Sequence, residues 1–305
     1  MFSITDSSQT IIDCLMKEAN KYGVEIMMNS DVRSMKYENG KFHFQLSDLR
    51  PLTSDFVCVA CGGYPKSSMF NWLTSLRHSI EEPVPSLFTF NMPGNSVTRL
   101  MGVVAENASV KIIGSKLSEQ GPLLITHWGM SGPVILKLSA WGARELADKN
   151  YHFNILVNWI STYNEQSLRE AWQQIRTKYS AQKIGNRNPF ELPSRLWIYL
   201  LNQSGINEDI RWADLPAKEQ NKLIKNLTAH EFEVKGKTTF KEEFVTSGGI
   251  KLAEIDATTM QSKIVPNLYF AGEILDVDGI TGGFNFQHAW TSGWIAAKNI
   301  AATDQ

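Results

Sequence analysis

The spacing of apolar residues predicts a helix and then several short strands at the start of the chain. Residues 6–22 have the period of an amphipathic helix that ends at Gly23. Its apolar face consists of Ile11, Ile12, Leu15, Met16 and Ala19. Four β-rich runs follow: VEIMM, VRSMKYE, KFHFQL and FVCVACGG. Asn39-Gly40 between the second and third runs predicts a hairpin, because this dipeptide favours the tight turns that join adjacent strands.

The pattern changes at residue 83 and again at residue 164. Residues 83–163 contain spaced β-like runs, which are SLFTFNM, SVKIIG, GPLLITHW and YHFNILVNW. Within them, Ser131-Gly132-Pro133 predicts the start of a helix. Residues 164–229 are helical in pattern and lack strand alternation. The chain then returns to β character in EFEVKGKTTF and FVTSGGIKL.

The densest chemical signal lies between residue 268 and residue 300. A short strand ends at Gly272, acidic residues follow, and a glycine-rich loop then leads into a helix of small residues. The N–H groups of such a loop and the positive end of the helix can hold a flavin ring edge or a pyrophosphate. An acid just after the strand can accept hydrogen bonds from ribityl hydroxyls. The alternative is that the glycines only form a tight turn and the acids are solvated.

Three blocks of sequence resemble a known family. YFAGEILDVDGITGGFNFQHAWTSGWIAA is similar to the C-terminal flavin motif of bacterial FAD-dependent oxidoreductases of the aminoacetone oxidase-like and BaiN-like type. LLITHWGMSGPVILKLS resembles the THxGxSGPxxLxLS block of that family. VTSGGIKLAEIDATTMQSKIVPNLYFAGE resembles its VTxGGVxLxEIxxxTMxSKxxxGLYFxGE block, and CGGYPKSS corresponds to its TGGxSxP stretch.

The resemblance implies an α/β protein, α+β overall. Its partial Rossmann-like FAD domain is interrupted by a β-rich domain that carries a helical subdomain. The changes in pattern place these parts at 1–82 with 251–305, at 83–163 with 230–250, and at 164–229. FAD is the implied cofactor, and NAD(P)H is a further candidate.

The resemblance also implies a set of cofactor-binding residues. Gly272 and Glu273 would contact the ribityl–pyrophosphate region, Val32 would contact adenine through its backbone, and Gly62 lies in the CGGYPKSS stretch. Asp276 is a further candidate from the acidic turn. The isoalloxazine would be lined by Ile280, Thr281, Gly282, Gly283, Phe284 and Asn285.

One element of the family pattern is not found in this sequence. Family members begin with a strand, a GxGxxG turn and a helix that bind the ADP half of FAD. This chain opens at MFSITDSSQT, which resembles a stretch well inside the FAD domain. Two hypotheses follow: a truncated form of a functional oxidoreductase, or a shortened, non-catalytic protein that binds FAD weakly or not at all. An open sheet edge would then favour a homo-oligomer.

Composition narrows the classes of partner. The formal net charge of −1 gives no global reason to expect a nucleic-acid partner, and no apolar run is long enough to predict a membrane span. The three cysteines form no disulfide framework, which favours the cytoplasm. Cys58 and Cys61 form a CxxC, but the apolar run around them favours inert core cysteines over a metal or redox site.

Candidate catalytic side chains are few. His127 lies beside the predicted helix start, and His288 lies in the last helix near the glycine loop; each is also compatible with a structural role. The leading hypothesis is an FAD-dependent oxidoreductase acting on a small amine or unsaturated carbonyl compound. A non-catalytic binding protein is the alternative. A flavin-dependent enzyme that modifies nucleic acid is a third hypothesis, disfavoured by the near-neutral charge.

Overall fold

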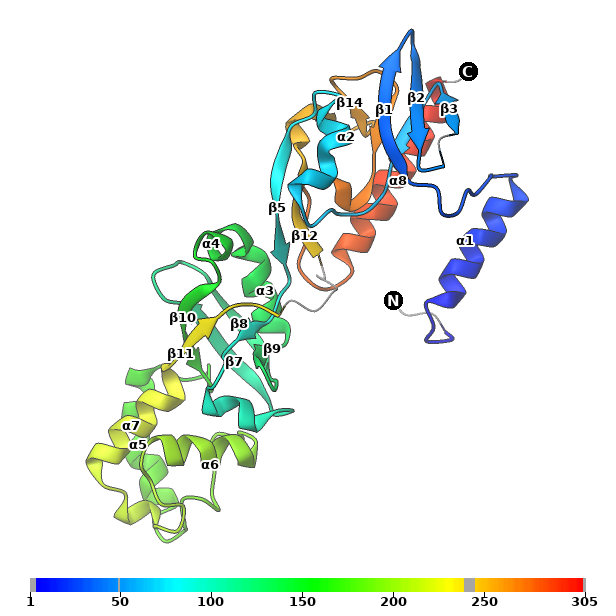
Figure 1. Cartoon of the computed structure of the whole chain (residues 1–305). Coiled ribbons are helices and arrows are strands. Elements are labelled where there is room, and N and C mark those ends of the chain that lie inside the picture. Colours follow the sequence, from blue (N-terminus) through cyan, green and yellow to red (C-terminus); the bar gives the residue numbers. More distant parts are fainter. Residues whose placement is uncertain (1–3, 49, 239–244, 304–305) are drawn as a thin grey trace. The chain divides into compact units, whose positions relative to one another are not determined.

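The chain consists of two compact units, Met1–Phe56 and Val57–Gln305 (Figure 1). The computed structural model describes residues 4–48, 50–238 and 245–303. The division at Phe56 falls inside the segment that the sequence assigns to the FAD domain. The domain boundaries expected from the sequence therefore remain predictions.

The described part of the first unit contains a helix and a three-stranded antiparallel sheet in the order β1-β2-β3 (Figure 1). Its elements are α1 (Gln9–Lys21), β1 (Val32–Glu38), β2 (Lys41–Leu46) and β3 (Pro51–Ser54). The hairpin between β1 and β2 is confirmed. Asn39 and Gly40 have φ angles of 54° and 79°, the left-handed values that a two-residue turn of this kind requires.

Helix α1 confirms the predicted amphipathic segment, but it buries none of its residues. Leu15, on its apolar face, is 62% exposed. The strand predicted for VEIMM is wrong, since residues 24–28 form no strand. Met28 of that run is exposed, so its apolar side chain has no core to enter. β-propensity without a pairing partner is not sufficient to form a strand.

The described residues of the second unit form three sheets. Their orders are β11-β10-β7-β8-β9-β6, β12-β5 and β13-β14-β15-β4. Pairing is antiparallel except between β15 and β4, which are parallel. The strands are β4 (Val57–Val59), β5 (Ile80–Ser86), β6 (Phe90–Asn91), β7 (Val104–Ile112), β8 (Ser118–Ile125), β9 (Gly129–Ser131), β10 (His152–Asn158), β11 (His230–Lys235), β12 (Val245–Ile250), β13 (Ile255–Asp256), β14 (Gln261–Ser262) and β15 (Leu268–Phe270).

The helices of this unit, apart from α2, lie in stretches predicted to be helical. They are α2 (Asn71–Thr74), α3 (Pro133–Trp141), α4 (Ala143–Asp148), α5 (Glu165–Lys178), α6 (Ser194–Gln203), α7 (Ala217–Thr228) and α8 (Phe284–Thr303). Short 3-10 turns are η1 (Ser67–Phe70), η2 (Ser96–Leu100), η3 (Trp212–Asp214), η4 (Leu252–Glu254) and η5 (Gly272–Ile274). Helix α3 begins at Pro133 as predicted, with Gly132 as its N-cap. Helices α5 to α7 lie within the segment 164–229.

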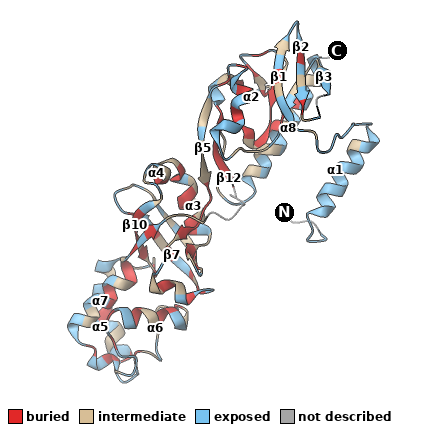
Figure 2. Cartoon of the chain, viewed as in Figure 1, coloured by how far each residue is buried: buried red, intermediate tan, exposed pale blue. Residues whose placement is uncertain are grey.

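One hydrophobic core joins the six-stranded sheet to helices α5, α6 and α7 (Figure 2). Trp159 at the end of β10 belongs to the same cluster as Trp172 of α5, Trp197 of α6 and Trp212 of η3. All four rings are fully buried. The β-rich and helical segments that differ so clearly in sequence pattern therefore share their interior.

The mixed α/β class is confirmed by these sheets and helices. The parallel β15–β4 pair is the Rossmann-like feature of the second unit, with Tyr269 opposite Cys58. Part of the predicted runs EFEVKGKTTF and FVTSGGIKL, residues 239–244, lies outside the described residues. Within the described chain, no helix has both the length and the apolarity needed to cross a bilayer.

Candidate functional site

The end of strand β15 is tied to helix α8 by two hydrogen bonds. The chain leaves β15 at Gly272, whose φ of 75° lies in the left-handed region that glycine tolerates best. The backbone N–H of Gly272 donates to Ser292 Oγ at 2.9 Å. His288 Nε2 donates to the Gly272 carbonyl at 3.3 Å. Both partners are side chains of α8, so the helix lies directly against the turn that follows the strand.

The segment 276–283, called the glycine loop below, is closed by a single amide side chain. Asn285 Oδ1 accepts from the backbone N–H of Gly279 at 2.8 Å, and its Nδ2 donates to the Gly279 carbonyl at 3.0 Å. Gly282 and Gly283 have φ angles of 123° and 89°, which other residues adopt only with strain. The loop therefore leads into the N-terminus of α8, where the free N–H groups and the helix dipole favour negative charge.

A cavity of about 500 Å³ lies between the turn after β15, the glycine loop and the first turns of α8. This volume falls within the range of about 300–1,000 Å³ that is usual for ligand sites. The lining residues are Ala60, Gly62, Leu87, Val245, Ala271, Gly272, Glu273, Val277, Ile280, Thr281, Gly282, Gly283, Asn285, Phe286, His288, Ala289 and Gly293. Most are apolar or glycine, which suits a flat aromatic ring held by backbone groups.

The Glu273 carboxylate is fixed in this cavity from two sides. Its Oε1 accepts a hydrogen bond of 2.7 Å from the backbone N–H of Thr246 in β12. Gly63 leaves room for it, because a Cβ at that position would lie 2.9 Å from Glu273 Cδ. At Gly62 and Gly283, by contrast, an added Cβ would meet no atom within 4 Å. The two glycines thus leave open backbone surface beside the carboxylate, a cradle that fits the flavin and ribityl part of FAD.

Most of the cofactor residues expected from the sequence come together at this cavity. Eight of them line it: Gly62, Gly272, Glu273, Ile280, Thr281, Gly282, Gly283 and Asn285. Phe284 and Asp276 are not among the lining residues. Val32 begins strand β1 of the other unit, so its expected contact with adenine remains a prediction. His127 is exposed, with its ring centre 4.0 Å from that of Trp128, and is not among the lining residues, whereas His288 is.

Comparison with known proteins identifies the family. Residues 1–299 match the model of the HI0933-like protein Rossmann domain. This chain belongs to the HI0933-like Rossmann-domain family. Members of this family are flavoproteins, which agrees with the cradle beside Glu273.

Three curated relatives align with nearly the whole of this chain. It is 30% identical to the ribosomal RNA dihydrouridine synthase of Escherichia coli over 97% of this chain and 73% of the relative. It is 28% identical to the Haemophilus influenzae protein of the same name, over 97% and 73%. It is 23% identical to the 3-dehydro-bile acid delta(4,6)-reductase of Clostridium scindens, over 97% and 74%. These relatives support a flavoprotein oxidoreductase in general.

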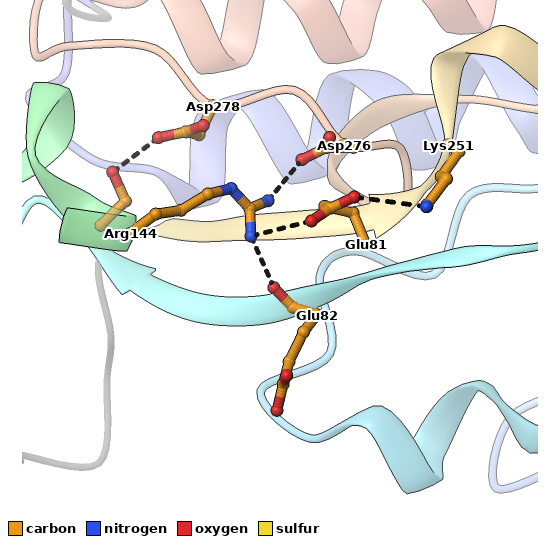
Figure 3. A network of polar contacts seen from close by, with 7 residues as sticks. Glu81, Glu82, Arg144, Lys251, Asp276 and Asp278 are labelled. Carbon is orange, nitrogen blue, oxygen red and sulfur yellow. Dashed lines mark hydrogen bonds and ion pairs between the residues drawn. The ribbon is translucent and has the colours of Figure 1, made fainter. Parts of the chain in front are cut away.

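Asp276 has a different environment from the one expected of a cofactor ligand (Figure 3). Its carboxylate pairs with Arg144 Nη2 of α4 at 3.2 Å. The same guanidinium reaches Glu81 Oε1 at 3.4 Å. Desolvation raises the pKa of Asp276; Arg144 opposes this shift, while Glu81 and Asp278 reinforce it. Asp276 therefore connects the glycine loop to α4 and β5, and its predicted contact with the cofactor remains untested.

Several lining residues were not expected from the sequence, and Leu87 and Val245 are the two that come from distant strands. Leu87 follows β5 with a φ of 58°, an uncommon conformation for leucine, and Val245 begins β12. The two strands pair in register, with Val245 opposite Ser86. They are about 160 residues apart in the chain, so no local pattern could have joined them.

The two cysteines of the CxxC motif are not buried in a core, so that part of the interpretation from the sequence is wrong. Cys58, in the edge strand β4, and Cys61, beyond that strand, are both exposed. Partial desolvation by the surrounding protein raises the pKa of both thiols above the ordinary value. Within the described chain, no group of three or more His, Cys, Asp or Glu side chains could hold a metal ion.

Proposed function

We propose that this chain is an FAD-dependent reductase that adds two hydrogens across a carbon–carbon double bond conjugated to a carbonyl, and that its substrate is a uridine of ribosomal RNA. The observation that supports it most is the cavity between the glycine loop, Glu273 and the first turns of α8. When bound and reduced, FAD supplies the two electrons of such a reaction.

The names of the relatives describe similar chemistry. Dihydrouridine is uridine with two hydrogens added across the double bond next to a ring carbonyl. The 3-dehydro-bile acid delta(4,6)-reductase acts on double bonds that extend from an oxidised position 3. A conjugated carbonyl is the shared feature, because it stabilises the negative charge that develops when the double bond accepts a hydride. The higher identity of the two RNA enzymes favours uridine as the substrate.

The lining residues can take distinct roles in this reaction. The N-terminus of α8 and the N–H groups of Gly282 and Gly283 would favour the negative charge of a reduced flavin ring. Glu273 has Oε1 occupied by Thr246, which leaves Oε2 to accept from ribityl hydroxyls. His288 is the other titratable side chain among the lining residues, so we assign it the proton that completes the reduction.

A small unsaturated carbonyl compound is the second candidate substrate. It is supported by the bile acid relative and by the whole-chain net charge of −1. The expectations of no nucleic-acid partner, no membrane partner, homo-oligomer formation and a cytoplasmic location remain untested, as does the use of NAD(P)H. The alternative of a non-catalytic protein also remains open to the same experiment.

A half-reaction separates these hypotheses. The purified chain is supplied with FAD, and bound flavin is measured by its visible absorbance. The bound flavin is then reduced with dithionite without oxygen and mixed with unmodified ribosomal RNA or with a 3-oxo-Δ4 steroid. We expect the RNA to reoxidise the bound flavin. The recovered RNA should then contain a nucleoside two mass units heavier than uridine. Reoxidation by the steroid alone would support the second substrate, and bound flavin that neither compound reoxidises would refute the reductase.

A further inference from the structure

Charge is distributed unevenly along the chain. Residues 83–250, the insertion expected from the sequence, contain 19 Lys and Arg against 15 Asp and Glu, a net charge of +4. The rest of the chain contains 11 against 16, a net charge of −5. The whole-chain value of −1 therefore conceals a basic insertion and an acidic remainder. Basic residues favour binding of a polyanion where they gather on one surface.

Two cations of this insertion converge on one buried tyrosine. Lys178 Nζ lies 5.2 Å from the centre of the Tyr179 ring, and Arg187 Cζ lies 4.7 Å from it. Tyr179 is 8% exposed, and its ring lies 6.3 Å from that of Trp212 in the core. Hydrogen bonds from Arg187 and then from Lys178 lower the pKa of its hydroxyl. Two exposed positive groups thus flank a fixed phenol.

Among the described residues, the two cations have no acidic partner in an ion pair, unlike some lysines of the same segment. Lys183 pairs with Asp209 at 2.8 Å, and Lys149 pairs with Glu145 at 2.6 Å. In the residues that the structure describes, no ion pair involves Lys178 or Arg187. Lys178 ends α5, where a cation interacts favourably with the helix dipole. That explanation does not extend to Arg187, which belongs to the loop between α5 and α6.

We propose that Lys178, Arg187 and the Tyr179 hydroxyl bind a phosphate of the RNA backbone. Arg187 can offer two parallel N–H donors, Lys178 a point charge, and Tyr179 an O–H donor that buried packing holds in place. Contacts to phosphate fix the position and orientation of a nucleic acid without reading its sequence. The site would therefore help to orient the RNA whose uridine is reduced, and in this respect it rests on the proposed function.

The test measures binding of the full chain to a ribosomal RNA fragment by fluorescence anisotropy over a series of salt concentrations. The variant K178Q/R187Q should bind about tenfold more weakly at moderate salt, and its slope of log K against log salt should fall by about 1. The matched control K149Q/K183Q removes the same charge from paired lysines, and its affinity should change far less. Equal losses in the two variants would show a general charge effect and would overturn the site.

Two further measurements keep the outcomes distinct. Y179F keeps the ring and removes the hydroxyl, so it should weaken RNA binding while the melting temperature stays near that of the parent. Loss of inorganic phosphate binding in K178Q/R187Q, with RNA binding unchanged, would show a free-anion site and refute the proposal. RNA binding that depends on the cluster, without uridine reduction, would retain the site and refute the proposed function.

Discussion

The Glu273 carboxylate accepts a hydrogen bond of 2.7 Å from the backbone N–H of Thr246, 27 residues before it in the chain. This contact joins the turn after β15 to strand β12, which pairs with β5. Thr246 is buried, so removing the carboxylate takes away the acceptor that the structure gives its N–H. One side chain thus has two roles, holding the wall of the cavity in place and offering its second oxygen to a ligand.

Replacing Glu273 separates these roles. Glu273→Ala leaves the Thr246 N–H unsatisfied, which should lower the free energy of unfolding by about 1–3 kcal/mol. Glu273→Gln keeps an oxygen acceptor for that N–H and should remain close to the parent in stability. Urea unfolding of both variants provides the measurement. A Gln variant as unstable as the Ala variant would show that the charge, rather than the hydrogen bond, stabilises this turn.

Two glycines near the cavity should respond in opposite directions to alanine. A Cβ at Gly63 would lie 2.9 Å from Glu273 Cδ and Oε1, so Gly63→Ala must displace the carboxylate. We expect a loss of about 1–3 kcal/mol in stability, the usual cost of overpacking. Gly293 lies inside α8, where an added Cβ meets no atom within 4 Å. Gly293→Ala should therefore gain about 0.5–1 kcal/mol, since alanine favours the helix.

Thermal unfolding compares the two alanine variants directly. Their melting temperatures should lie on either side of that of the parent. The same pair also tests the cavity, because Gly293 is a lining residue and its new methyl group would reduce the volume available to the cofactor. A stabilised Gly293→Ala protein with weaker flavin binding is the expected combination. If Gly63→Ala is as stable as the parent, Glu273 is not confined as the structure shows.

The local part of the site could be predicted because its signals lie close together in the sequence. The strand that ends at Gly272, the acid at Glu273 and the glycines before α8 all lie within 22 residues. Positive φ at Gly282 and Gly283 is what such a loop requires, and it is encoded by the residue type itself. Eight of the expected cofactor residues accordingly line one cavity.

The remaining features depend on contacts between distant segments. Arg144 meets Asp276 across 132 residues, and nothing in either local sequence specifies the pair. Cys58 lies in an apolar run that is typical of a buried strand, yet its side chain is exposed in the folded chain, and β4 lies at the edge of its sheet. The charge contrast between the insertion and the remainder could be counted from the sequence, but the approach of Lys178 and Arg187 to the Tyr179 ring could not. Register, edge position and spatial grouping of charge are properties of the tertiary fold.

The raised pKa of Asp276 predicts a specific dependence of stability on pH. Its pKa in the folded chain lies above the ordinary value of 3.8, so the folded state holds the proton more tightly than the unfolded state does. Stability from this group is therefore present at low pH and is lost as the pH rises through the folded pKa. Asp276→Asn cannot ionise. Its stability relative to the parent should improve as the pH rises from about 4 to neutrality.

Asp256 provides a control of opposite sign. Hydrogen bonds from Thr258 lower the pKa of its exposed carboxyl below 3.8. The stability that it contributes is present above the ordinary pKa and is lost as the pH falls. Asp256→Asn should therefore lose stability relative to the parent as the pH rises. Unfolding curves at several pH values should give opposite slopes for the two asparagine variants, and equal slopes would contradict the assignment of the raised pKa to Asp276.

His230 should make the β-rich sheet sensitive to acid. Burial lowers its pKa to about 4, while an unfolded histidine titrates near 6.5. The unfolded state thus binds the proton first as the pH falls, and stability is lost between about 6.5 and 4. The lowering of the His230 pKa from 6.5 to about 4 corresponds to a loss of about 3 kcal/mol in the free energy of unfolding at low pH. His230→Gln removes this titration, so its free energy of unfolding should vary less with pH over that window than that of the parent.

A variant of the neighbouring tryptophan separates titration from packing. Trp159 Nε1 donates to His230 Nδ1 at 3.4 Å, and glutamine at position 230 can still offer an oxygen to it. Trp159→Phe removes the donor and a large buried ring, which lowers stability at every pH. The Trp159→Phe variant keeps His230 against Phe232, with ring centres 4.2 Å apart. Its free energy of unfolding should therefore still fall as the pH is lowered from 6.5 to 4. A flat profile in Trp159→Phe would instead assign the acid sensitivity to the indole contact, because burial of the imidazole alone would then be insufficient to produce it.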